Sequence, residues 1–183
     1  MLLILTSVLA AAASYKAQMA DGSSLPEIKE WHLHVYFLAS NQEQVALADG
    51  LRTKIISAVA EHRFVAVCHG VGTSILPNLS AEDAARVPLF NTKPIGPHVS
   101  GSFEVWVPRE YLSELLGWAL PRRGKLTYLL HPLGEDELTA HTRDVAFFGT
   151  PYPLDTSVFD SSHAQTNMTK SEYPSLKLGY AAP

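Results

Sequence analysis

Residues 31–37 read WHLHVYF, a run with the length and composition of a buried strand. Val35, Tyr36 and Phe37 are β-branched or aromatic, and the run is too short for a typical helix. Side chains in a strand alternate between two faces. The apolar face is predicted to carry Trp31, Leu33, Val35 and Phe37, and the opposite face His32, His34 and Tyr36. One side of an otherwise apolar strand therefore carries two imidazoles and a phenol.

The composition is that of one compact domain. Of the 183 residues, 46% are hydrophobic and 17% are charged, which is enough for one core but short for two full domains. A net charge of −4 gives no electrostatic reason to expect a nucleic-acid partner. The single cysteine, Cys68, cannot form an internal disulfide and is predicted to be a small buried side chain.

The spacing of hydrophobic residues predicts four strands and three longer helices. The strands are expected at residues 31–37, 63–69, 101–108 and 125–132. The helices are expected from Ser40 to about His62, from Pro108 to about Pro121, and from about Asp136 to Phe148. Ser40 and Glu43 form a capping box at the start of the first helix. A short helix is also expected at residues 80–87.

The element order, β-α-β-β-α-β with an extra C-terminal helix, predicts a ferredoxin-like α+β sandwich over residues 29–150. Residues 151–183 lack a period and are expected to form an irregular surface tail. Residues 1–28 are interpreted as a leader. Its first 14 residues have the length of a signal peptide but no preceding Lys or Arg, and they are too short to span a membrane. A cytoplasmic protein is expected, and a secreted one if the leader is a cleaved signal.

Strand order predicts which histidines meet. We expect the first and third strands to be central and parallel, with the fourth antiparallel beside the first. The starts of strands one and three and the end of strand four would then share one edge. His32 and His34 lie at the start of the first strand. His98, in GPHVSG, lies just before the third strand, and His131 lies at the end of the fourth. Alternation also predicts Glu104 and Trp106 on the face without helices.

Convergent imidazoles are most simply explained by a metal ion, because neutral histidine is the commonest metal ligand. Each motif also has a structural explanation: His32 and His34 as a solvent-facing pair, and GPHVSG as a turn. His141 is predicted on the inward side of the last helix. It would be either a core histidine bonded to a carbonyl or a proton-transfer group. Glu137, one turn earlier, would orient His141 or bind the metal.

The blocks WHLHVYF, GPHVSGSFEVWVP and LTYLLHPLGEDELTAHT, with FFG shortly after, resemble the fungal and bacterial DOPA 4,5-dioxygenase family. The resemblance covers about residues 29–150. It implies a ferredoxin-like domain, a non-haem Fe(II) centre, and extradiol cleavage of a catechol such as L-DOPA in pigment (betalain) biosynthesis. The histidine blocks of the family match His32, His34, His98, His131 and His141.

Topology and chemistry assign roles within this site. The predicted metal ligands are His34, His98 and His131, with Glu104 as the replacement for one and zinc as a substitute for iron. The predicted catalytic residues are His141, His32 and Tyr36. Glu104 and Trp106 are predicted to contact substrate, and either Arg109 or Arg143 to meet a substrate carboxylate. The expected partners are a catechol and O2, without nucleic acid or membrane, and a homodimer is left open.

Two other classes of function use the same sequence features. A metal-dependent hydrolase could hold zinc with the same histidines. Alternatively, ferredoxin-like sheets often bind ligands or form dimers without catalysis. Metal content and oxygen consumption separate these alternatives from a dioxygenase.

Overall fold

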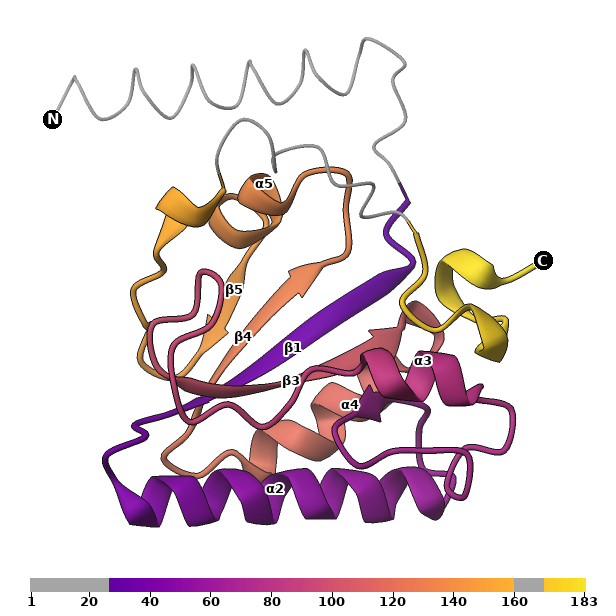
Figure 1. Ribbon diagram of the computed structural model, residues 1–183, viewed down its shortest axis with the longest axis horizontal. Coiled ribbons are helices and arrows are strands. Elements are labelled where there is room, and N and C mark those ends of the chain that lie inside the picture. The colour runs from indigo at the N-terminus through magenta and orange to yellow at the C-terminus, as the bar shows by residue number, and fades with distance from the viewer. Residues whose placement is uncertain (1–26, 160–169) are drawn as a thin grey trace, which may run out of the picture.

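A five-stranded antiparallel sheet forms the centre of the computed structural model, which describes residues 27–159 and 170–183 (Figure 1). The strands are β1 (Glu30–Phe37), β2 (Val67–Cys68), β3 (Gly101–Pro108), β4 (Thr127–Pro132) and β5 (Ala146–Phe148). Their order across the sheet is β2-β3-β1-β4-β5. The first four strands have the ferredoxin-like order, so the predicted α+β fold is confirmed.

The central pair of strands runs in opposite directions, which corrects the predicted parallel arrangement. In β1 and β3, His34 lies opposite Glu104 and Tyr36 opposite Ser102, in antiparallel register. Both β1 and β2 pair antiparallel with β3, so β1 and β2 are parallel and β3 between them must be reversed. The start of β3 therefore lies beside the end of β1, not beside its start. The predicted pairing of β1 with β4 is confirmed, with His32 opposite His131.

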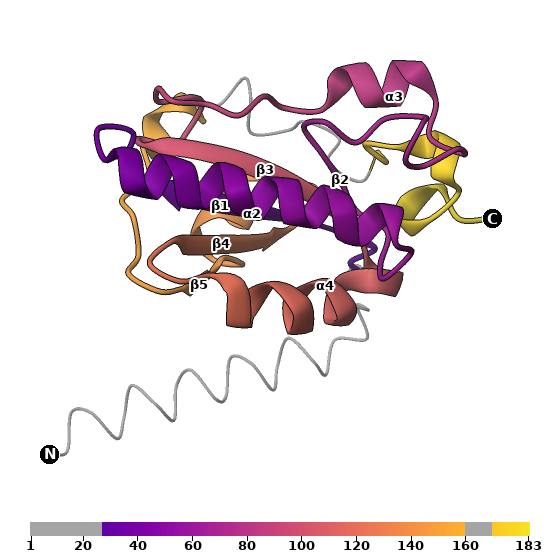
Figure 2. The same ribbon diagram turned by 90° about the horizontal axis from the view of Figure 1, so that it is seen from below.

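The helices lie on both sides of the sheet. They are α2 (Gln42–Ala60), α3 (Ala81–Arg86), α4 (Leu112–Ala119) and α5 (Glu137–Thr142). In Figures 1 and 2, α2 and α4 run along one face, and α5 lies on the other. Asn41 caps α2 by accepting hydrogen bonds from the backbone N–H groups of Glu43 and Gln44 at 3.0 and 3.2 Å. The cap therefore falls one residue after the predicted Ser40, because Asn is as good a cap as Ser.

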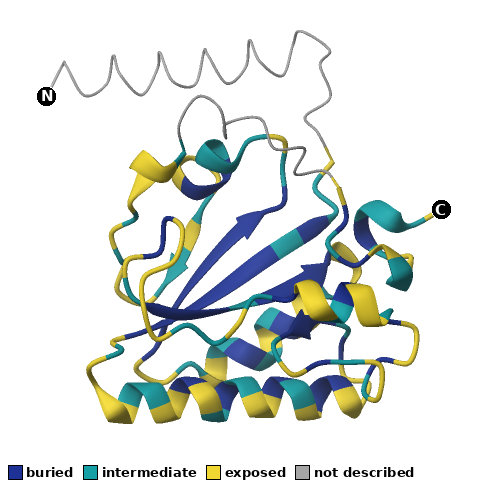
Figure 3. Ribbon diagram, in the orientation of Figure 1, coloured by how far each residue is buried: buried dark blue, intermediate teal, exposed yellow. Residues whose placement is uncertain are grey.

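The apolar face of β1 packs in the core, as its alternation predicts. Leu33, Val35 and Phe37 are fully buried in one cluster with Leu51 and Ile55 of α2. Figure 3 shows the same arrangement as a buried stripe on the sheet side of α2. Burying a Leu, Ile or Phe side chain contributes roughly 1.5–3 kcal/mol. This face holds β1 rigidly, which fixes the direction of His32 and His34 on the other face. Cys68 is buried, as predicted.

The last helix, predicted from about Asp136 to Phe148, is shorter than expected, and its second half is wrong. The helix α5 ends at Thr142, and Ala146–Phe148 form β5 instead. Phe148 lies opposite Tyr128 and Ala146 opposite Leu130 in β4. The apolar spacing fitted a helix, but β4 would otherwise be an edge strand with unpaired backbone groups, which β5 satisfies. The second strand is also shorter than predicted, only Val67–Cys68.

The described C-terminal segment packs on the domain, so the expectation of a surface tail is wrong for residues 171–180. Tyr173 is fully buried. The buried carboxylate of Glu30 accepts hydrogen bonds from the backbone N–H groups of Tyr180 at 3.0 Å and Glu172 at 3.3 Å. Gly179 has φ +57°, and a Cβ there would collide with the Glu30 side chain. These contacts bring Glu172 to the open side of the sheet.

One sequence-based expectation concerns residues that the structure does not describe. The predicted leader falls almost entirely within residues 1–26. Across the described ranges, no helix combines the length and apolar character needed to cross a membrane.

Candidate metal centre

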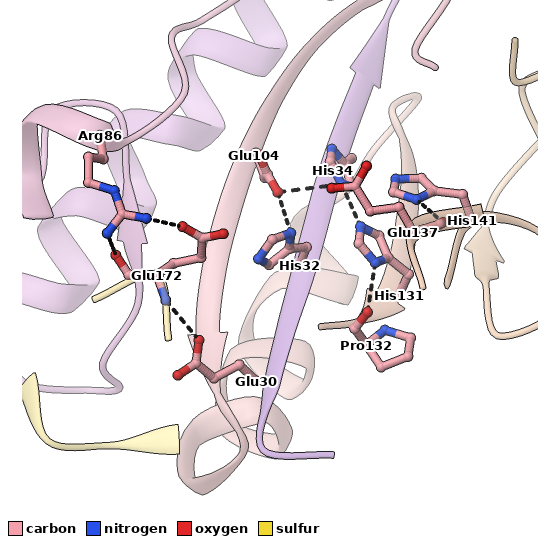
Figure 4. Close-up of polar contacts among 10 residues, drawn as sticks. All are labelled: Glu30, His32, His34, Arg86, Glu104, His131, Pro132, Glu137, His141 and Glu172. Atoms are coloured by element: carbon pink, nitrogen blue, oxygen red, sulfur yellow. Dashed lines mark hydrogen bonds and ion pairs between the residues drawn. The ribbon is translucent and has the colours of Figure 1, made fainter. Parts of the chain in front are cut away.

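Five histidines converge on one pocket on the α5 side of the sheet. The pocket has a volume of about 290 Å³. Its histidines are His32 and His34 from β1, His131 from β4, His141 from α5 and His98 from the segment before β3. All five are buried, and the exposed fraction of His131 is 0%. Figure 4 shows four of them facing one another across the strands. The polar face of β1 therefore forms one wall of a pocket, as the alternation predicts.

His32, which is buried, forms an ion pair with the half-buried Glu104. The His32 Nδ1 atom lies 2.6 Å from Glu104 Oε1, and the same oxygen lies 3.6 Å from His34 Nε2. Burial disfavours the charged form of His32, but the charge of Glu104 and its hydrogen bond outweigh burial and raise the His32 pKa. Burial likewise opposes ionisation of Glu104, but the His32 charge prevails and lowers the Glu104 pKa. Glu104 is therefore held as a carboxylate beside His34.

His34 and His131 face each other through their Nε2 atoms, which are 3.0 Å apart. His131 Nδ1 lies 2.9 Å from the Pro132 carbonyl oxygen, which can only accept, so Nδ1 carries the proton. The Nε2 atom of His131 therefore presents a lone pair to His34. Burial lowers the pKa of both rings, and neighbouring imidazoles lower it further. Both are neutral at neutral pH and suited to bind a cation.

His141 has the same tautomer as His131. Its Nδ1 donates to the Glu137 carbonyl oxygen one turn earlier in α5, at 2.8 Å. This confirms the hydrogen bond to a carbonyl that the sequence left as one of two alternatives. The ring is nevertheless in the pocket, with its centroid 4.1 Å from that of His131. Burial lowers the pKa of His141. A neutral imidazole with Nε2 free to accept a proton therefore lines the cavity.

His98 reaches the pocket by a different route from the one predicted. Because β3 is antiparallel to β1, the start of β3 is beside Tyr36. Backbone pairing of His98 with Ile95 and Leu154 holds the preceding segment over the sheet. Tyr36 is fully buried, and its hydroxyl lies 2.5 Å from His98 Nδ1. Tyr36 is not among the residues that line the pocket, so it would act through His98.

The Tyr36 contact sets the tautomer of His98. Burial raises the Tyr36 pKa, so the phenol keeps its proton. Burial, and the repulsion that a second protonated ring beside His141 would meet, lower the His98 pKa to about 4. Among the described residues, the buried Tyr36 hydroxyl forms a hydrogen bond with His98 alone, so this ring nitrogen is the one acceptor for its proton. The hydroxyl therefore donates to Nδ1, which leaves the ring proton of His98 on Nε2. His98 therefore presents an Nε2–H donor to the pocket in the metal-free protein.

Two overlapping groups of donor atoms are close enough to hold a metal ion. One contains His32, His34, Glu104 and His131, and the other His34, His98 and His141. The predicted ligands His34 and His131 therefore lie together, whereas His98 belongs to the other group. Glu104, predicted as a replacement ligand, takes the place beside His34 and His131. His34 is the member common to both groups.

The pocket wall contains residues that sequence reasoning missed. Phe159 and Glu172 line the cavity together with the predicted Glu104, Trp106 and Glu137. Residues 151–183 carry no periodic signal, and only the tertiary contacts of Glu30 bring Glu172 here. The two arginines proposed for a substrate carboxylate are elsewhere: Arg109 pairs with Glu27 and Arg143 with Asp144, and neither lines the pocket.

The neutral histidines make the metal-free protein sensitive to acid. Burial lowers the pKa values of His34, His98, His131 and His141 in the folded state, so the unfolded chain binds more protons below pH 6.5. The free energy of unfolding should therefore fall as the pH falls from 6.5 toward 4. With a folded pKa of about 4, His98 alone would contribute a loss of about 3 kcal/mol.

Urea unfolding of chelator-treated protein at pH 7.5 and pH 5 measures this effect. The urea midpoint should be clearly lower at pH 5. Equal midpoints would show that folding does not lower the pKa values of these histidines.

The fold and the pocket together define a class: a small α+β protein with a histidine-rich candidate metal centre on the open face of its sheet. The chain belongs to the Dopa 4,5-dioxygenase family, whose model matches residues 31–158. A protein of Amanita muscaria named DOPA 4,5-dioxygenase is 34% identical over 158 residues, which are 85% of this chain and 59% of that protein. The resemblance inferred from the sequence blocks is therefore confirmed.

Two other proteins are also similar. An uncharacterized 21.2 kDa protein of Botryotinia fuckeliana is 28% identical over 135 residues, 69% of this chain and 61% of that protein. The chain thus spans about three fifths of the length of these two relatives. A crystal structure from Nostoc punctiforme, provisionally described as a dioxygenase, has a TM-score of 0.54 at 22% identity. It covers 72% of this chain and 91% of that one, and it supports the fold.

Proposed function

We propose that this protein is an extradiol ring-cleaving dioxygenase that acts on a catechol such as L-DOPA and uses a non-haem Fe(II) ion. The observation that carries the proposal is a set of two buried, neutral imidazoles and one half-buried carboxylate in a pocket of a Dopa 4,5-dioxygenase family member. Family membership supports a dioxygenase with a small-molecule substrate and O2, and the pocket supports the metal.

His34, His131 and Glu104 fit an Fe(II) ion as ligands. The Nε2 atoms of the two histidines face each other at 3.0 Å, with the lone pair of His131 turned inward by the Pro132 carbonyl. Two histidines and one carboxylate are the usual donors of non-haem Fe(II) oxygenases. Zinc accepts the same donor types and is the expected substitute. His32, bonded to Glu104 at 2.6 Å, would orient that carboxylate.

Bound Fe(II) would supply a centre that brings catechol and O2 together and takes up electron density. The work of the chain is then positioning and proton transfer. His141 Nε2 forms no hydrogen bond with another described residue, and its Nδ1–H is fixed by the Glu137 carbonyl at 2.8 Å. In this role His141 accepts a proton from a catechol hydroxyl and later returns it. The Nε2–H group of His98, fixed by Tyr36, offers a hydrogen bond to a substrate oxygen.

The aromatic wall suits a flat ring. The Trp106 ring is stacked on His32 at 5.9 Å, and Phe159 lies 5.1 Å from the His141 ring, both measured between centroids. Both residues line the cavity. A cavity of about 290 Å³ is at the lower end of the usual range for small-molecule sites. A single catechol ring with a short side chain is a ligand of that scale.

Oxygen consumption tests the proposal directly. Protein purified without added metal is analysed for its metal content, then loaded anaerobically with Fe(II) or, as a control, with Zn(II). The Fe(II) protein should consume O2 with L-DOPA and form a yellow product, and the Zn(II) protein should not. The proposal fails if the Fe(II) protein consumes no O2 with any catechol tested. Hydrolase activity of the zinc form would support the alternative class.

A further inference from the structure

The charge of the pocket is one-sided. Three carboxylates line the cavity, those of Glu104, Glu137 and Glu172, and no Lys or Arg side chain lines it within the described ranges. Residues 160–169, which follow Phe159 at the pocket wall, contain neither Lys nor Arg in the sequence. His32 also lines the cavity, and its pKa is raised, but it is paired with Glu104 at 2.6 Å. A substrate that carries only a carboxylate would therefore meet no unpaired cation among the described residues of this wall.

Two of the three carboxylates already have partners. Glu104 is bonded to His32 at 2.6 Å, and Glu172 to Arg86 at 2.8 Å. Arg86 lies on the outer side of Glu172, away from the histidines in Figure 4. Glu137 has no ion-pair partner among the residues described, and it belongs to neither group of candidate metal ligands. The Glu137 side chain extends from α5 toward the face of β1 on which His34 lies (Figure 4).

We infer that the pocket selects catechols whose side chain ends in an ammonium group, and that Glu137 is the residue that binds it. This inference deepens the proposed function and rests on it. The ring would lie against the histidines, and the ammonium would form a charge-assisted hydrogen bond with the Glu137 carboxylate. A carboxylate in the same position would be repelled, and an uncharged side chain would leave Glu137 without a partner. Glu137 is then a specificity-determining residue, not a metal ligand.

Three catechols that differ in side-chain charge test the inference by binding. They are dopamine with an ammonium, 4-methylcatechol without charge, and 3-(3,4-dihydroxyphenyl)propionate with a carboxylate. Calorimetric titration of the Fe(II) protein under argon should give the tightest binding for dopamine and the weakest for the propionate. In Glu137→Gln, the affinity for dopamine relative to 4-methylcatechol should fall roughly tenfold or more, as expected for loss of a charged hydrogen bond.

Glu135→Gln is the matched control. Glu135 is exposed and does not line the pocket, so this variant changes net charge equally without removing the proposed contact. Its preference for dopamine should remain that of the unmodified protein, since exposed charges at a distance are screened by salt.

The outcomes separate the inference from the proposed function. Equal affinities for the three catechols, or an unchanged preference in Glu137→Gln, would overturn the inference alone. Loss of iron from Glu137→Gln would make Glu137 a metal ligand and also overturn it. Oxygen consumption with 4-methylcatechol is measured in parallel. Charge-selective binding without any oxygen consumption would overturn the proposed function and leave the ammonium site standing.

Discussion

His34→Ala should lose its metal and its activity together. His34 is shared by both groups of candidate ligands, and its Nε2 lies 3.0 Å from His131 Nε2. Any ion held in this pocket by either group therefore loses a donor. Even residues that only support a metal ligand cost 10- to 100-fold when replaced, so loss of a ligand should cost on the order of a thousandfold or more in kcat/KM. The measurement is metal per chain after anaerobic loading and dialysis, with oxygen consumption on L-DOPA.

His62→Asn is the control for His34→Ala. His62 is an exposed histidine just after α2, with φ +57°, a backbone conformation that Asn tolerates. This variant should bind a full equivalent of metal and retain its rate. Circular dichroism should show that both variants remain folded. A His34→Ala protein that still held one equivalent of iron would place the metal elsewhere and end the assignment of this centre.

His141→Ala should keep its metal and lose most of its rate. The ring lines the pocket, its Nδ1–H is fixed by the Glu137 carbonyl at 2.8 Å, and burial lowers its pKa so that it is neutral at neutral pH. General acid–base catalysis by such a group contributes about 10²- to 10⁴-fold. The loss should appear in kcat, with iron content equal to that of the unmodified protein. The pH dependence of kcat should also flatten, because the titrating group is gone.

Metal content decides between the two groups of ligands. If His141→Ala loses iron while His131→Ala retains it, the ion is held by His34, His98 and His141 instead. That result would assign proton transfer to the other side of the pocket.

Much of the candidate site was predictable because it depends on local alternation. The two faces of WHLHVYF follow from the period of a strand, and the structure places Leu33 in the core and His34 in the pocket. The antiparallel pairing of β1 with β4 brings His32 opposite His131, also as predicted. In contrast, His98 was predicted at the pocket for a wrong reason. It is near the end of β1, and its segment folds back over the sheet.

Local sequence thus determined the polar face of β1, the ferredoxin-like order of elements and the family, because strand and helix periods are properties of neighbouring residues. Tertiary structure decided what surrounds that face. The direction of β3, the replacement of a helix end by β5, and the return of Glu172 to the pocket depend on contacts between residues far apart in the chain. Such contacts satisfy buried backbone and carboxylate groups, including Glu30, and no local pattern encodes them.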